Sequence, residues 1–304
     1  MLRTKFPSRL SFLALAGSML FITAPAASQD AEEPASSIIV EGEIPAEAAD
    51  VRDLVQKLAG SHRMDEPATR YFDPLCISVS GLNQAGNAYI RDRIYENAAA
   101  IGVENKGDDC LANAMILIHD DPEALVEMIL EQRPQLLPAE NRDTVRKQLA
   151  DGSMVIVWHN ERDYDLGGRP GVINSAIPGD DSVGGQMNVQ AQININNWPS
   201  RTRIAYSRAV VSAAVILDAD IVEGMDINRL ADYTMMRLMA PGLVPLEDET
   251  PMPESITAPF PEETGVNMLT RFDRAYLTAL YSMRPNAPAP RLAERVAEVY
   301  NEGL

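Results

Sequence analysis

Hydrophobic positions recur along the chain with two different spacings, which separate predicted helices from predicted strands. Between Asp226 and Ala240, apolar side chains fall every three or four residues, and Pro241 follows. This spacing gives a helix one apolar face, Asp226 or Asn228 can cap its start, and Pro-Gly ends it. The same spacing predicts helices over residues 45–59, 85–101, 123–132, 141–150, 269–281 and 291–301.

Alternating or continuous apolar runs predict the strands. In residues 72–82, Leu75, Ile77 and Val79 alternate with smaller polar side chains, as in a strand with unlike faces. Residues 110–118 and 154–158 are short apolar runs, and 207–217 is rich in Ala and Val. The strand–helix–strand order over 72–118 requires a right-handed crossover and favours parallel strands. Two further strands are predicted, a half-buried edge strand at Met187–Ile195 and an irregular one at Val172–Ile177.

The start of the chain predicts export. Arg3, Lys5 and Arg9 precede the apolar run Leu10–Thr23, and small residues end the segment at Ser28. This pattern is typical of a secretory signal peptide, which we assign to residues 1–28. No later stretch is long and apolar enough to span a bilayer. We therefore expect a periplasmic or secreted protein without membrane insertion after cleavage.

The charge balance restricts the classes of partner. The chain has 26 basic and 44 acidic residues, a net charge of −18. Residues 1–30 contain three basic residues and one acidic residue, so their removal leaves 23 and 43, a net charge of −20. A surface with this charge repels phosphate backbones and anionic lipid. Nucleic acid is therefore excluded as an expected partner.

The chain has two cysteines, Cys76 and Cys110. In an exported protein such a pair is interpreted as a disulfide, and the alternative is two buried thiols. Each cysteine lies at the start of one of two neighbouring predicted strands, at the same edge of the sheet. We therefore predict that the two are joined.

The order of elements in the second half of the chain resembles a known family. The strand 207–217 and the helix 226–240 are followed by a Pro-rich segment, 243–261, which we interpret as an extended lid or linker. A helix with the pattern Leu-Thr-x-x-Asp-x-x-x-Leu-x-x-Leu-Tyr then runs from Leu269 to Tyr281. This order resembles the zincin metalloproteases, and in particular small secreted zincin-like proteins of bacteria with a degenerate zinc motif. Zincins place His-Glu-x-x-His on the first of these helices.

In this chain the zincin motif falls on residues 231–235. Ala231 and Met235 occupy the histidine positions, and Asp232 occupies that of the catalytic glutamate. The three histidines, His62, His119 and His159, all lie earlier in the chain. The resemblance therefore implies a zincin-like scaffold with no metal and no cofactor.

The resemblance also implies an α+β fold. We expect a mixed β-sheet with the active-site-type helix packed beneath it and a helical C-terminal part, in which Asp273 and Tyr281 are structural. Residues 29–69 are expected to form a disordered N-terminus and an accessory helix, and residues 70–304 a single zincin-like domain.

Three residues are weak catalytic candidates. His159 follows the predicted strand 154–158 and, with Glu161 close by, could act in acid–base catalysis or bind a cation. The alternative is a solvated loop, and we predict that His159 binds no metal. Asp232 is either a carboxylate in a cleft or an exposed charge on the helix.

Other acidic residues have two interpretations. After His119, Asp120 or Asp121 can cap the next helix. The acidic run before the central helix could hold calcium, or its charges could favour the helix start; it consists of Asp218, Asp220, Glu223 and Asp226.

Three functional hypotheses remain. The first is an exported, non-catalytic zincin-like protein that binds a peptide, a protein or an envelope component. The second is a hydrolase or peptidase that uses His159 and nearby carboxylates with a non-standard metal site. The third is a structural envelope protein without a small ligand.

Overall fold

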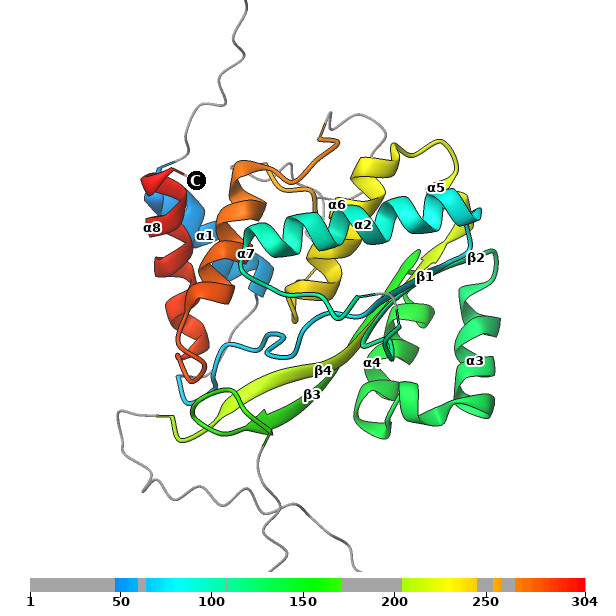
Figure 1. The fold of residues 1–304 in the computed structure, drawn as a ribbon, viewed down its shortest axis with the longest axis horizontal. Helices are drawn as coiled ribbons and strands as arrows, with labels where there is room; N and C mark the ends of the chain where they lie inside the picture. The colour runs from blue at the N-terminus through cyan, green and yellow to red at the C-terminus, as the bar shows by residue number, and fades with distance from the viewer. Residues whose placement is uncertain are drawn as a thin grey trace, which may run out of the picture. The chain divides into compact units, whose positions relative to one another are not determined.

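A four-stranded mixed sheet in the order β1-β2-β4-β3 forms the centre of the fold (Figure 1). The strands β1 (Ile77–Ser80), β2 (Ala114–His119) and β4 (Ser207–Asp218) run parallel, and β3 (Val155–Tyr164) pairs with β4 in the antiparallel direction. Ala114 pairs with Ile77 on one side and with Ala213 on the other. The predicted parallel pair around a crossover helix is confirmed.

The computed structural model describes residues 47–59, 64–107, 109–170, 204–244, 254–257 and 266–303. All of them lie in one compact unit, Ile44–Leu304. The signal peptide, the polar segment after it, the strands expected at Val172–Ile177 and Met187–Ile195, and most of the Pro-rich segment lie outside the described residues.

Eight α-helices and two 3₁₀ turns are present in the described residues. No helix among them has both the length and the apolar character that crossing a membrane requires. The helices are α1 (Ala48–Ala59), α2 (Gln84–Ala100), α3 (Pro122–Gln132), α4 (Ala139–Ala150), α5 (Ala219–Val222), α6 (Ile227–Met239), α7 (Arg271–Ser282) and α8 (Leu292–Glu302), and the turns are η1 (Pro134–Leu136) and η2 (Ala289–Arg291).

The helices cover both faces of the sheet (Figure 1). On one face, α3 and α4 pack against Ile156, Trp158 and Ile216. On the other face, α2 and α6 pack against side chains that include Ile116 and Val215, and α1, α7 and α8 extend the same core. The predicted α+β class, with a mixed sheet and a helical C-terminal part, is confirmed.

The strand β3 is longer than predicted. The sequence prediction ends it at Trp158, because the following residues are polar and charged. The strand instead continues to Tyr164, which pairs with Ser207 of β4. Within this extension Asn160 and Tyr164 are buried, whereas Glu161 is exposed, so the polar residues occupy a strand that pairs with β4. The predicted loop position of His159 is therefore wrong.

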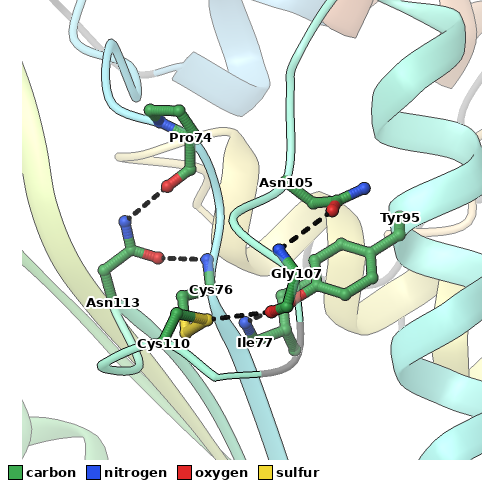
Figure 2. Close-up of a disulfide and its surroundings, with 8 residues drawn as sticks. All are labelled: Pro74, Cys76, Ile77, Tyr95, Asn105, Gly107, Cys110 and Asn113. Carbon is green, nitrogen blue, oxygen red and sulfur yellow. Dashed lines mark hydrogen bonds between the residues drawn. A yellow bond between two sulfur atoms is a disulfide. The ribbon is translucent and has the colours of Figure 1, made fainter.

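The cysteines Cys76 and Cys110 form a disulfide, as predicted (Figure 2). Cys76 directly precedes β1, and Cys110 lies on the segment that leads into β2. Their Cα atoms are 6.0 Å apart, within the range that a disulfide spans. The bond closes a loop that contains the whole of α2.

The disulfide should contribute measurably to stability. Its cysteines are separated by 34 residues, and closing a loop of this length stabilises a fold by about 3–4 kcal/mol on the chain-entropy estimate. We predict that the double variant Cys76→Ser, Cys110→Ser lowers the free energy of unfolding by this amount. Urea denaturation of both proteins under non-reducing conditions measures the difference. Equal midpoints would contradict the prediction.

Candidate functional site

The helix α6 is buried over almost its whole length. Asp226 caps it by accepting hydrogen bonds from the backbone N–H groups of Asn228 and Arg229, at 2.8 Å and 3.3 Å. Every residue from Leu230 to Met239 is buried, and Ile227 is partly buried. A surface helix has one apolar face and one solvated face, so α6 is a core element on all sides.

The positions of the zincin histidines are filled by core side chains. Ala231 and Met235 are both 0% exposed and belong to the main hydrophobic cluster. Alanine has no ligand atom, and the thioether of methionine is a soft ligand that zinc rarely takes. Methionine also fills irregular gaps well, because its side chain is unbranched. Neither residue can supply a metal ligand of the zincin type.

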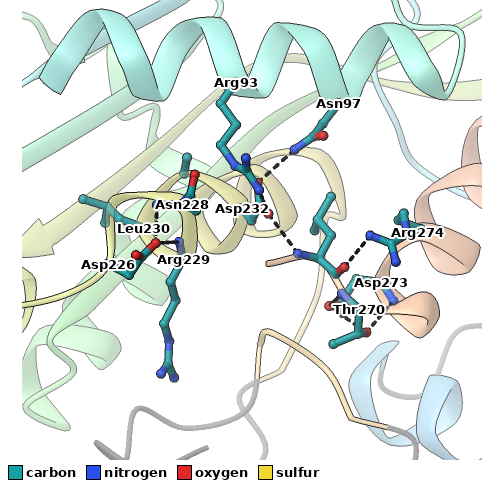
Figure 3. Close-up of polar contacts among 12 residues, drawn as sticks. Arg93, Asn97, Asp226, Asn228, Arg229, Leu230, Asp232, Thr270, Asp273 and Arg274 are labelled. Carbon is teal, nitrogen blue, oxygen red and sulfur yellow. Dashed lines mark hydrogen bonds and ion pairs between the residues drawn. The ribbon is translucent and has the colours of Figure 1, made fainter. Parts of the chain in front are cut away.

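Asp232 is buried and not an exposed helix charge, so that expectation is wrong (Figure 3). Its side chain is 1% exposed. Arg93 of α2 donates to both carboxylate oxygens, from Nε to Oδ1 and from Nη2 to Oδ2, each at 2.7 Å. Asn97 Nδ2 and the backbone N–H of Leu269 also donate to it, both at 2.9 Å. The ion pair raises the pKa of Arg93 further above its ordinary value.

Two residues of α7 hold the segments around α6 in place. Asp273 is fully buried and accepts hydrogen bonds from the Ser255 hydroxyl at 2.6 Å and from the Ile256 N–H at 2.9 Å. It also forms a capping box with Thr270 at the start of α7 (Figure 3). Tyr281 donates from its hydroxyl to the carbonyl oxygen of Met239, at the end of α6, at 3.1 Å. Burial raises the pKa of Asp273.

His159 lies within β3 and faces the end of α6. Its Nε2 donates to the carbonyl oxygen of Leu238 at a distance of 3.1 Å, which places the ring proton on Nε2. Burial lowers the pKa of His159 to about 4, and the nearby charge of Arg237 acts in the same direction. The imidazole is therefore neutral at physiological pH and is held by a structural hydrogen bond.

Glu161 lines a small cavity between β3 and the end of α6. The cavity measures about 70 Å³, and Pro241 and Tyr276 also line it. Partial burial raises the pKa of Glu161, whose side chain is 37% exposed, and Arg208 Nε lies 3.9 Å from Oε2. Asp232, His159 and Glu161 have different hydrogen-bond or ion-pair partners. The structure does not join these three candidates into one constellation.

Two of the remaining acidic candidates, Asp121 and Asp218, cap helices. Asp121 caps α3 by accepting from the N–H of Ala124 at 2.9 Å, and its own N–H donates to His119 Nδ1 at 3.0 Å. Asp218 caps α5. Across the described residues, no three side chains of His, Cys, Asp or Glu converge in a group that could hold a metal ion. His62 lies outside the described residues.

A large hollow beside β1 and α2 was missed by reasoning from the sequence. We call it the β1–α2 groove; it measures about 660 Å³. Its walls are β1 with Cys76, one side of α2, and the segment around the disulfide. The residues that line it are Cys76, Ile77, Ser78, Val79, Gln84, Asn87, Ala88, Arg91, Tyr95, Gly107, Cys110 and Ala112. No motif identifies such a groove, because its walls come from three segments that meet only in the fold.

Comparisons with protein-family models, with curated proteins and with solved structures found no match to this chain.

The ion pair of Asp232 generates a stability prediction. Asp232→Ala leaves the partly buried guanidinium of Arg93 without its carboxylate, and breaking a buried pair in this way costs about 3–5 kcal/mol. Because the Arg93 side chain is 21% exposed, we expect a loss of about 3 kcal/mol. Urea denaturation measures it.

The matched control for Asp232 is Asp143→Ala. Asp143 pairs with Arg146 on the exposed surface of α4, with 94% of its side chain accessible. An exposed ion pair contributes about 0–1 kcal/mol, so this variant should unfold close to the wild type. A similar loss for both variants would contradict the interpretation of Asp232 as a buried structural charge.

His159 generates a prediction for pH. Its pKa is about 4 in the folded protein and about 6.5 in an unfolded chain. Between these values the unfolded chain binds a proton that the folded protein does not, so stability falls as the pH is lowered from about 6.5 to about 4. The maximum contribution is about 3 kcal/mol. His159→Gln keeps a donor for Leu238 and should lose less stability over this range.

The measurement is the difference in unfolding free energy between His159→Gln and the wild type at a series of pH values. Other buried acids titrate in the same range, but they are common to both proteins and cancel in the difference. A difference that stays constant from pH 7 to pH 4 would contradict the assignment of a buried neutral imidazole.

Proposed function

We propose that this chain is an exported, non-catalytic zincin-like protein that binds a peptide or a protein segment. One observation carries the proposal. The three positions that hold the zincin chemistry, Ala231, Asp232 and Met235, are part of the hydrophobic core or of a buried ion pair. The helix that would support catalysis supports packing instead.

The chemistry of the site argues against residual zincin activity. A catalytic zinc needs three protein ligands that converge at about 2.0–2.3 Å and an open position for water. A general base must also be within hydrogen-bond reach of the proton that it abstracts. The carboxylate of Asp232 already accepts four hydrogen bonds and is 1% exposed. It can neither bind a water molecule nor reach a substrate.

The zincin-like assignment rests on the arrangement of the second half of the chain. The strand β4 leads through α5 into α6, which packs on the sheet, and α7 contacts α6 in the same core. Hydrogen bonds join Asp232 to Leu269 just before α7, and Met239 to Tyr281 within it. The pattern that the sequence shares with zincins thus falls on contacts that fix α6 in place. The disulfide is compatible with export, because such bonds persist in oxidising compartments.

The two alternative functions have weaker support. The hydrolase hypothesis needs His159 and a carboxylate to act together, but the Nε2 of His159 is used by Leu238 and its neighbours do not converge on it. The purely structural hypothesis gives no role to an open groove of about 660 Å³. Ligand sites are typically hollows of about 300–1,000 Å³, so the groove favours a binding protein.

We predict that purified mature protein contains no stoichiometric zinc and does not cleave casein. Elemental analysis of protein purified without chelator, together with a casein assay with and without EDTA, tests this. The reason is the absence of converging ligands at Ala231 and Met235. Zinc at about one ion per chain, or cleavage that EDTA abolishes, would refute the hypothesis of a non-catalytic protein.

A further inference from the structure

The outer edge of β1 carries backbone groups that are only partly used. Just before β1, the N–H of Leu75 donates to Glu104 and its carbonyl accepts from Lys106, at 2.8 Å each. The chain itself therefore occupies this edge at Leu75, as a parallel bridge. At Ile77 the N–H donates to the hydroxyl of Tyr95, at 2.9 Å (Figure 2).

Beyond Ile77 the same edge is open. Backbone groups of successive strand residues point to opposite sides, and Cys76 uses its carbonyl to bond Asn113 and Ala114 on the β2 side. Ser78 and Ser80 therefore face β2, and the N–H and C=O of Val79 face the groove. Within the described part of the chain, these Val79 groups make no hydrogen bond. An unpaired edge of this kind is a template for one more strand.

The walls of the groove suit an extended chain. The groove is bounded opposite β1 by α2, whose Ala88 and Tyr95 line it, and its volume is about 660 Å³. Leu111 stands next to the groove residues Cys110 and Ala112, and it is 92% exposed. The disulfide fixes this segment to Cys76, so the apolar side chain is held near the rim.

We propose that the β1–α2 groove binds an extended polypeptide segment, which adds to the outer edge of β1 as a fifth strand. The segment lies along the outer edge of β1, beyond the position where residues 104–106 pair with Leu75. It bonds to the N–H and C=O of Val79. This inference rests on the proposed binding function and gives it a place and a ligand class. Main-chain bonds supply affinity in this mode, and pockets for alternate side chains supply specificity.

The side chains of the segment should be uncharged where they face α2. On the α2 side of the groove the lining residues Gln84, Asn87, Ala88 and Tyr95 are uncharged, and the charge of Arg91 is paired with Asp92 at 2.9 Å.

The probe is an acetylated, amidated hexapeptide of alternating threonine and valine, which is extended and uncharged. We expect saturable binding to the mature protein by calorimetry and slower hydrogen exchange at the amide of Val79. The same peptide with every backbone nitrogen methylated cannot donate to the edge of β1, so it should bind at least about tenfold more weakly. Absence of binding by the parent peptide, or equal binding of the two peptides, overturns the proposal.

A matched pair of substitutions on α2 locates the site. Ala88→Arg places a long side chain in the groove and should weaken binding by about tenfold or more. Ala85→Arg introduces the same residue at an exposed position of the same helix outside the groove, and should change affinity less than about twofold. Circular dichroism is used to check that both variants are folded. Equal affinities of the two variants would place the peptide elsewhere.

Val79→Pro removes the outward N–H, which makes no bond to β2, and should also weaken binding. The zinc and casein measurements do not depend on the groove. Zinc-dependent cleavage would overturn the proposed function, whereas inactive protein that binds peptide independently of Ala88 would overturn only the strand-addition inference.

Discussion

The charge of Asp232 has to be neutralised inside the protein, and this constraint fixes the arrangement of three helices. A carboxylate removed from water is tolerated only when it is paired and hydrogen-bonded. Arg93 and Asn97 meet this requirement from α2, and the N–H of Leu269 meets it from the segment before α7. The position of α6 between α2 and α7 is thus determined by directional contacts as well as by apolar burial.

The spacing of apolar residues along the chain predicted most helices and strands. It did not predict which groups the buried polar side chains bond to. The spacing of Leu230, Met235 and Leu238 gave a correct helix, and the alternation around Val79 gave a correct strand. The burial of Asp232 depends on Arg93, which is 139 residues away, and no local signal links the two. The extension of β3 beyond Trp158 likewise depends on pairing with β4, whose strand partner for Tyr164 is Ser207. In the sequence alone, a strand segment with several charged residues cannot be distinguished from a loop.

The candidate site shows the same division. The sequence showed that Ala231 brings no ligand atom and that Met235 brings only a soft thioether, because this follows from residue type alone. It did not show the β1–α2 groove, which exists only because α2, β1 and the segment near Cys110 lie together. The helix pattern of the second half of the chain and the β1–α2 groove are therefore different parts of the structure. The spacing of residues in α6 predicted how that helix packs, and the groove became visible only in the fold.

The disulfide has a consequence for the order of events during folding. Cys76 and Cys110 enclose α2, so the bond brackets the crossover that joins β1 to β2. Pairing of parallel strands across a crossover is a non-local step, and its loop-closure entropy opposes it until the contacts form. Once the bond exists, the starts of both strands are held together even in the unfolded chain. In an oxidising compartment, the starts of β1 and β2 are therefore already joined when folding begins. In a reducing compartment, they must first come together from 34 residues apart.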